Sequence, residues 1–209
     1  MGATPQLWKA TYEAKTAEDL ADAYQKWACL YDHDTCKTMG YVGPQTAAAM
    51  LDRYLDSRQS RVLDAGCGTG LVGEILHRLG YAHVDGMDYS GDMLAEAEKK
   101  GVYRQLMQED MNERLAIAND SYDATICVGT FTYAHVGPEA FNELVRVTRP
   151  GGIICFTIRD GAYQEYDYRS AMLHMEACET WELQELREHD YLTHEKVTAK
   201  FCTYKVLSN

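Results

Sequence analysis

The sequence Arg61-Val62-Leu63-Asp64-Ala65-Gly66-Cys67-Gly68-Thr69-Gly70 decides the fold of this chain. Val62 and Leu63 predict a short buried strand, which three glycines at every second position follow directly. After these glycines, residues 71–79 have the apolar spacing of a helix, and Gly80 is the stop signal of that helix. A strand, a glycine-rich turn and a helix are typical of a nucleotide-binding element, because glycines let the backbone approach a ligand that the helix N–H groups then face.

The identity of the nucleotide depends on Asp64. Residues 68–73 match the dinucleotide fingerprint G-x-G-x-x-G, so an NAD or FAD site is one interpretation. However, Asp64 ends the strand where a pyrophosphate would lie, and two like charges in a poorly solvated turn repel each other. A ligand with an ammonium group would favour this carboxylate. S-adenosylmethionine has an ammonium group, a sulfonium and no phosphate, so it fits the turn better.

The same segment resembles motif I of the class I S-adenosylmethionine-dependent methyltransferases, acidic-x-G-x-G-x-G. The resemblance covers residues 24–160 well and the tail loosely. Within the class I methyltransferases, the chain most resembles the family of the methyltransferase-like protein of the Williams–Beuren chromosomal region. It implies an α/β fold, a doubly wound and mostly parallel seven-stranded sheet with a reversed last strand. The cofactor contacts that it implies in this segment are Asp64, Ala65, Gly66 and Gly68.

Length and composition predict a single domain. The 209 residues are enough for one well-buried α/β core and few for two, and 46% hydrophobic with 25% charged residues is ordinary for a globular protein. No repeat, low-complexity segment or linker divides the chain. We expect N-terminal helices and a lid in residues 1–57, the cofactor-binding core in 58–160, and a substrate-side helix with a final hairpin in 161–209.

Charge and cysteine content restrict the partners. The formal net charge of −12, with no basic patch, argues against nucleic acid. Seven cysteines without a C-x-x-C pair predict reduced thiols and a cytoplasmic protein, with nuclear entry left open. No apolar run is long enough to span a membrane. We therefore expect a monomer that binds no metal, no membrane and no nucleic acid, and whose partner is a small-molecule or protein methyl acceptor.

An aromatic stripe marks the N-terminal part of the chain. Residues 16–31 predict a helix, on which Trp27 and Tyr31 share one face. Core packing is one interpretation of this stripe. The segment 24–32 also resembles the "Tyr-x-x-Trp-Ala-x-x-Tyr-Asp" opening of many small-molecule methyltransferases, which implies that Trp27 and Tyr31 lie over the cofactor as a lid. A second helix is predicted for residues 44–55.

The next predicted strand, residues 82–88, ends in a carboxylate. Asp88 lies about 20 residues beyond the glycines, where a ribose-binding carboxylate is expected, since one carboxylate can accept from both ribose hydroxyls. Helix capping is the other interpretation of Asp88, but Ser90 is better placed for it. The methyltransferase resemblance adds Tyr89, beside the adenine, and Met93 to the cofactor contacts.

A third short strand is predicted for residues 103–108, followed by Asp110 and Met111. A carboxylate here could accept from an adenine amino group while a backbone N–H holds a ring nitrogen. An acidic residue after a strand is more often a solvated turn. Resemblance to motif II of the methyltransferases implies the adenine role for Asp110 and Met111.

The fourth predicted strand, residues 121–128, leads into the loop 129–136. In open parallel sheets, ligands bind beyond the carboxyl ends of strands near the switch in strand order. Val128 and Gly129 are therefore expected to contact the cofactor where its methyl group emerges. His135 is a weak candidate for touching the substrate, because a lone loop histidine is more often a surface residue. No other catalytic residue is proposed.

The rest of the chain predicts the far edge of the sheet. A helix over residues 138–148 and the tight turn Arg149-Pro150-Gly151-Gly152 resemble the methyltransferase crossover into the strand 153–158. Residues 160–180 could form a helix that either shapes the acceptor pocket or covers the sheet. Two strand-like runs, 181–195 and 196–206, predict a final hairpin.

These observations predict S-adenosylmethionine-dependent methyl transfer to an unidentified acceptor, with S-adenosylhomocysteine as product. The reaction needs alignment and desolvation more than a base, since the leaving group is a neutral thioether. An NAD-dependent oxidoreductase and a non-catalytic cofactor-binding interaction module are the alternatives.

Overall fold

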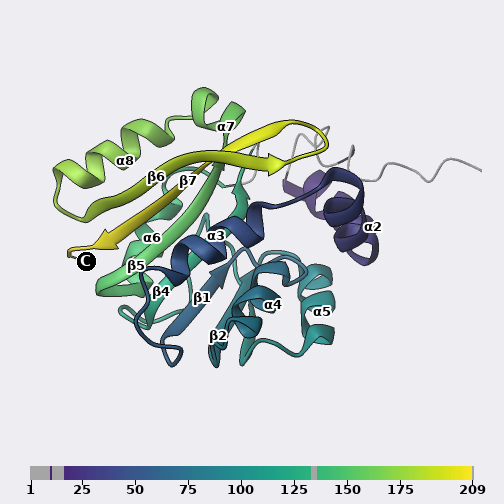
Figure 1. Ribbon diagram of the computed structural model, residues 1–209, viewed down its shortest axis with the longest axis horizontal. Helices are drawn as coiled ribbons and strands as arrows, with labels where there is room; N and C mark the ends of the chain where they lie inside the picture. Colours follow the sequence, from purple (N-terminus) through teal and green to yellow (C-terminus); the bar gives the residue numbers. More distant parts are fainter. Residues whose placement is uncertain (1–9, 11–16, 133–135, 209) are drawn as a thin grey trace, which may run out of the picture.

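A seven-stranded sheet in the order β3-β2-β1-β4-β5-β7-β6 forms the centre of the molecule (Figure 1). The computed structural model describes residues 10, 17–132 and 136–208. The strands are β1 (Arg61–Ala65), β2 (His83–Asp88), β3 (Gln105–Gln108), β4 (Tyr122–Phe131), β5 (Thr148–Arg159), β6 (Trp181–Leu192) and β7 (Val197–Val206).

The strand pairing confirms the predicted doubly wound sheet. Strands β1 to β5 pair in parallel, whereas β7 is antiparallel to both β5 and β6. Because β1 pairs with β2 on one side and β4 on the other, the chain reverses its direction across the sheet at β1. The carboxyl ends of β1 and β4 therefore flank the switch point at which open α/β sheets bind ligands.

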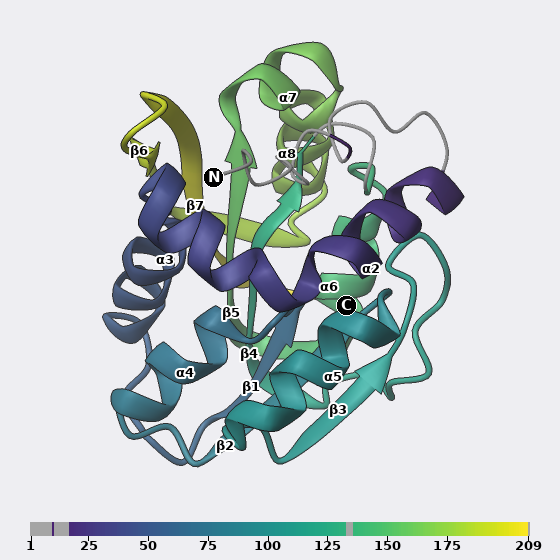
Figure 2. The ribbon, with the colours of Figure 1, turned by 90° about the vertical axis from the view of Figure 1, so that its right-hand side faces the viewer.

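Helices cover both faces of the sheet, and Figure 2 shows α2, α3, α4 and α5 in front of it. In chain order, the helices are α2 (Ala17–His33), the π-helix η1 (Asp34–Met39), α3 (Gly43–Asp52), α4 (Leu71–Arg78), α5 (Gly91–Lys100), α6 (Ala140–Val147), α7 (Asp160–Glu165) and α8 (Tyr168–Ala177). None of the helices in the described part of the chain is both long and apolar enough to cross a membrane.

Two hydrophobic clusters, one on each face, explain the apolar run in β5. Ile154 and Phe156 point into the cluster beneath α6 and α8, whereas Cys155 points into the cluster beneath α3 and α4. The first cluster includes Trp181 and Tyr204, whose rings stack with centroids 4.1 Å apart. A strand covered on both faces has apolar side chains at consecutive positions, which is the pattern seen here.

The predicted tight turn at residues 149–152 is instead an irregular start of β5. The strand begins at Thr148, and the register with β4 shifts just beyond it, so these residues bulge from the sheet. Gly152 is required because an added Cβ would lie 2.7 Å from the carbonyl oxygens of Arg149 and Asp123. The turn signal in the sequence thus produces a bulge, because the neighbouring strand continues to pair across it.

Three other boundaries differ from the sequence prediction. Strand β4 continues to Phe131, which pairs with Ile158 beyond a second register shift. The stretch 160–180 forms two helices, because Tyr166 adopts an extended conformation between them. Helix α2 runs directly into the π-helix η1, which no sequence signal indicated. The predicted hairpin of β6 and β7 is confirmed.

Candidate active site

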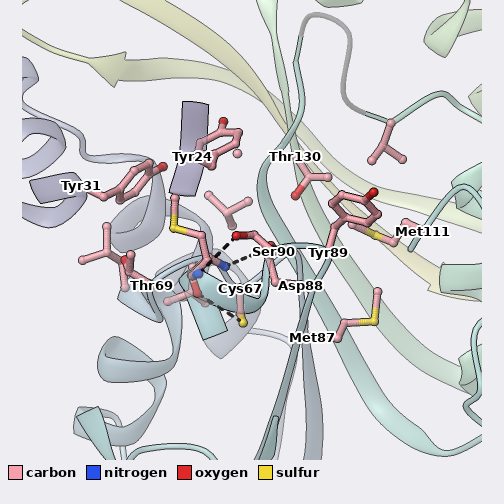
Figure 3. A pocket seen from close by; sticks show the side chains of 18 of the residues that line it. Tyr24, Tyr31, Cys67, Thr69, Met87, Asp88, Tyr89, Ser90, Met111 and Thr130 are labelled. Carbon is pink, nitrogen blue, oxygen red and sulfur yellow. Dashed lines mark hydrogen bonds between the residues drawn. The ribbon is translucent and has the colours of Figure 1, made fainter. Parts of the chain in front are cut away.

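A cavity opens beyond the carboxyl ends of β1, β2 and β4, at the switch point (Figure 3). The glycine turn forms one wall, and Tyr24 and Tyr31 of α2 form another. Its charged lining residues are all carboxylates: Asp88, Glu109 and Asp110. No lysine or arginine lines it within the described residues, so it offers no side-chain cation to pair with a phosphate.

Hydrogen bonds to β2 hold the glycine turn in place. The backbone N–H groups of Gly66 and Cys67 donate to the carbonyl oxygen of Met87 at 2.8 and 2.9 Å. Gly66 has a φ of +73°, and an added Cβ would lie 2.2 Å from the Thr130 hydroxyl. Gly68 has a φ of +53°, with nothing within 4 Å of an added Cβ. The turn therefore presents bare backbone to the cavity at Gly68.

Asp88 is fixed by backbone donors at the end of β2. One carboxylate oxygen accepts from the Gly68 N–H at 2.8 Å, and the other accepts from the Ser90 N–H at 2.9 Å. Ser90 itself caps α5 by accepting from the Met93 N–H at 3.3 Å, as predicted. Burial raises the pKa of Asp88 above its ordinary value. Each oxygen keeps a lone pair, so the carboxylate can still accept from a ligand in the cavity.

Asp64 lies beneath the glycine turn and does not line the cavity. Its side chain is fully buried and accepts from the Tyr103 hydroxyl at 2.6 Å. The pKa of Asp64 is raised from 3.8 to about 7, mainly by burial; the Tyr103 hydrogen bond opposes this rise and the negative charge of Asp88 contributes to it. Asp64 thus lies outside the cavity lining and is a carboxylate whose pKa is near neutral pH.

The pKa of Asp64 predicts pH-dependent stability of the ligand-free protein. Between about pH 4 and pH 7 the unfolded chain is ionised at this position while the folded chain is still protonated. The free energy of unfolding should therefore fall as pH rises through this window, by up to about 4 kcal/mol, and change no further above it. Asp64→Asn should remove this slope. The free energy of unfolding of the variant should therefore increase relative to that of the unchanged protein as pH rises.

Urea unfolding of both proteins across this pH window measures the effect. Asp123→Asn is a suitable control, because Arg149 holds the pKa of Asp123 below its ordinary value, so folding does not change the ionisation of this carboxylate through most of the window and the variant should keep the slope. Parallel pH profiles for the unchanged protein and Asp64→Asn would show that Asp64 is ionised in the folded protein at all these pH values.

The aromatic stripe of α2 is divided between the protein interior and the cavity. Trp27 is 4% exposed, lies with ring centroids 6.2 Å from Tyr24 and 4.6 Å from Tyr31, and donates to the Asp34 carboxylate at 3.0 Å. Tyr24 and Tyr31 line the cavity, whereas Trp27 does not. Trp27 therefore supports the two tyrosines from behind.

Polar side chains connect the end of α2 to the glycine turn and α5. One oxygen of Asp32 accepts from the Thr69 hydroxyl, and the other accepts from the Lys100 ammonium at 2.6 Å. Lys100 also donates to Glu74 at 2.8 Å. These contacts hold the end of α2 to the glycine turn and to α5.

Residues 63–156 match the Methyltransferase domain family. Human Methyltransferase-like protein 27 is 32% identical over 177 residues, which cover 82% of this chain and 71% of that protein. The chain belongs to the S-adenosylmethionine-dependent methyltransferases. The family resemblance predicted from the motifs is thereby confirmed, and the relatives give no support to the oxidoreductase alternative.

Other proteins similar to this methyltransferase are named for different acceptors or for none. Malonyl-[acyl-carrier protein] O-methyltransferase of Pectobacterium atrosepticum is 36% identical over 106 residues, and the match spans 50% of this chain and 41% of that enzyme. A protein solved in complex with the Haloferax volcanii Trm112 methyltransferase activator superimposes with a TM-score of 0.67 at 17% identity, covering 89% of this chain and 98% of that one. Magnesium protoporphyrin IX methyltransferase of Synechocystis, solved with bound S-adenosylmethionine, superimposes with a TM-score of 0.61 at 17% identity. The superposition covers 100% of this chain and 86% of that one. These structures confirm the fold.

The cavity of this methyltransferase suits its cofactor. Carboxylates match the hydroxyl, amino and ammonium donors of S-adenosylmethionine, and the open backbone at Gly68 leaves room for a close approach. Of the predicted cofactor contacts, Trp27, Asp64 and Ala65 lie behind the cavity wall. The others line it: Tyr31, Gly66, Gly68, Asp88, Tyr89, Met93, Asp110, Met111, Val128 and Gly129. His135, the weak catalytic candidate, lies outside the described residues.

Sequence reasoning missed several lining residues. Cys67, Thr69 and Ser90 stand within or beside the predicted motifs, so their positions could have been inferred from their neighbours. Tyr41 follows η1 and reaches the cavity only through its pairing with β6. Thr130 does so because β4 is longer than predicted.

Proposed function

We propose that the protein transfers the methyl group of S-adenosylmethionine to a small-molecule or protein acceptor at the carboxyl end of β4. The observation that carries this proposal is the cavity at the switch point, where the charged lining residues in the described part of the chain are all carboxylates. The family supplies the reaction type, and the acceptor remains to be found.

The proposed contacts divide the cavity into regions. Asp88 would accept from the two ribose hydroxyls, and Asp110 with Met111 would hold the adenine beside Tyr89. The glycine turn would hold the methionine part, which places the reacting methyl group toward Val128 and Gly129. Trp27, Asp64 and Ala65 would act indirectly, by supporting the side chains and backbone that contact the cofactor.

The cofactor would supply a methyl group on positively charged sulfur, which leaves as a neutral thioether. The protein then has to align the acceptor and exclude water. Tyr24 and Tyr31 of α2 suit the second task, because they cover the cavity while the polar contacts of Asp32 hold the helix to the glycine turn.

Calorimetry tests the choice of cofactor. S-adenosylmethionine and S-adenosylhomocysteine should both bind, and NAD should give no measurable heat, because its pyrophosphate would face carboxylates and, among the described lining residues, no cation to pair with. Comparable affinity for NAD would contradict the proposal.

A screen for transfer of a labelled methyl group, with cell metabolites and proteins as acceptors, separates an enzyme from a non-catalytic binding module. We expect label in at least one acceptor. Tight S-adenosylmethionine binding with no transfer across a broad screen would favour the module instead.

A further inference from the structure

Two tyrosine hydroxyls meet beside the proposed methyl-transfer position. Tyr41 and Tyr191 are 150 residues apart in sequence, yet their hydroxyl oxygens lie 3.0 Å apart. Their rings meet edge to face, with centroids 4.9 Å apart at an interplanar angle of 67°. Neither the glycine turn nor the proposed contacts of the adenosine part involve this pair.

The fold makes room for the pair on two sides. The N–H of Val42 donates to the carbonyl oxygen of Tyr191 at 3.1 Å, which fixes the two backbone segments side by side. A Cβ added to Gly43 would lie 2.7 Å from ring carbons of both tyrosines. A Cβ added to Gly129 would lie 2.8 and 3.2 Å from their hydroxyl oxygens. Both rings thus occupy space that two glycines leave free.

The pair has an inner and an outer member. Tyr41 lines the cavity, whereas Tyr191, 6% exposed, lies behind it. Both hydroxyls lie against Gly129, at the carboxyl end of β4. Burial, with Tyr191 and Tyr31 nearby, raises the pKa of the Tyr41 hydroxyl well above its ordinary value. Tyr41 therefore remains an uncharged hydrogen-bonding group at neutral pH.

The surroundings of Tyr41 differ in charge from the rest of the cavity. The three lining carboxylates belong to the ends of β2 and β3, whereas the described lining residues toward β4 and α2 are uncharged: Tyr24, Tyr31, Pro44, Thr130 and Val136. An acceptor with a carboxylate would find no described cation to pair with here. An acceptor that had to lose a proton before attack would find no described base beside Tyr41.

We propose that the Tyr41–Tyr191 pair positions an uncharged amine as the methyl acceptor, with the Tyr41 hydroxyl oxygen accepting a hydrogen bond from the amine N–H. This inference rests on the proposed methyl transfer. The nitrogen lone pair forms the new N–C bond while the C–S bond breaks and leaves its electron pair on sulfur. The product is a methylammonium ion, which loses its proton to water, so no base is needed in the attack.

A set of ring probes of one size tests the proposal on the full chain saturated with S-adenosylhomocysteine. Aniline is an uncharged amine, toluene lacks the polar group, phenol has a hydroxyl and benzoate has a carboxylate. Ligand-observed NMR should show aniline binding about three- to tenfold more tightly than toluene, the contribution of one hydrogen bond. Benzoate should be the weakest ligand of the four.

Tyr41→Phe should abolish the preference for aniline over toluene, and Tyr191→Phe should reduce it by freeing the Tyr41 hydroxyl to rotate. Because aniline and toluene are nearly the same size, a change in the shape of the cavity should affect the two affinities alike and leave their ratio unchanged. Tyr204→Phe is a matched control, because Tyr204 is also buried and donates to Glu176 at 3.0 Å away from the cavity. The control should keep the preference.

Several results would overturn the inference: equal binding of aniline and toluene, a preference that survives in Tyr41→Phe, binding of phenol no tighter than that of toluene although its O–H can also donate to Tyr41, or tighter binding of benzoate than of aniline. S-adenosylhomocysteine binding is measured first in every protein. If the unchanged protein does not bind S-adenosylhomocysteine, the proposed function itself is refuted. Intact cofactor binding without the aniline preference would refute only the role of the tyrosine pair.

Discussion

The Asp88→Ala variant should bind S-adenosylhomocysteine about ten- to a hundredfold more weakly than the unchanged protein, since hydrogen bonds to a charged group contribute roughly 1.5–3 kcal/mol. Asp88 lines the cavity and is held between the N–H groups of Gly68 and Ser90. The substitution therefore removes the proposed ribose acceptor and also loosens the glycine turn. Both effects weaken binding, and calorimetry with the two proteins measures their sum.

Asp92→Ala is the matched control for this variant. Asp92 is an exposed carboxylate in the first turn of α5, it does not line the cavity, and its removal changes the net charge equally. We expect the control to bind S-adenosylhomocysteine like the unchanged protein. An unchanged dissociation constant in Asp88→Ala, with an intact circular dichroism spectrum, would contradict the ribose role of Asp88 and would also show that cofactor binding does not depend on its contacts with the turn.

The Trp27→Ala variant should release α2 from the domain. Removal of a buried tryptophan costs about 3–5 kcal/mol, here through lost contacts with Tyr24 and Tyr31. Because α2 lies at the surface of the fold, we expect the lost stability to appear as local opening of α2 and not as unfolding of the whole domain. Amide exchange over residues 17–39 should then accelerate by about a hundredfold or more, while β1 and β4 keep their protection. Affinity for S-adenosylhomocysteine should fall as Tyr31 loses its support.

Hydrogen exchange measured with and without S-adenosylhomocysteine tests both the variant and the lid. Leu30→Ala, at a position 41% exposed on the same helix, should leave exchange unchanged. In the unchanged protein, ligand should slow exchange over residues 17–39 more than in β1 and β4. Equal protection of this segment in both states would show that the stripe is ordinary core, and Tyr31 and its support by Trp27 would then have no part in the proposed cofactor site.

Local sequence patterns predicted most of the fold. The strand, glycine turn and helix around residues 61–79 appear where the apolar spacing placed them, because each depends on neighbours within a few positions. The Ser90 cap is confirmed for the same reason. The boundaries that failed lie at residues 129–131 and 149–152, where pairing between β4 and β5 overrode the turn propensity of glycine.

The sequence by itself determined the family and the part of the site that lies on the motif strands, because the carboxyl ends of parallel strands meet at one edge whatever the details of packing. Only the tertiary structure decided which side chains reach the cavity. Asp64 has the right residue type in the right motif, but packing turns it toward Tyr103 and away from the solvent that would keep its pKa low. Tyr41 and Tyr191 show the converse, since an antiparallel bridge between distant segments brings them together, and no short-range pattern encodes such a contact.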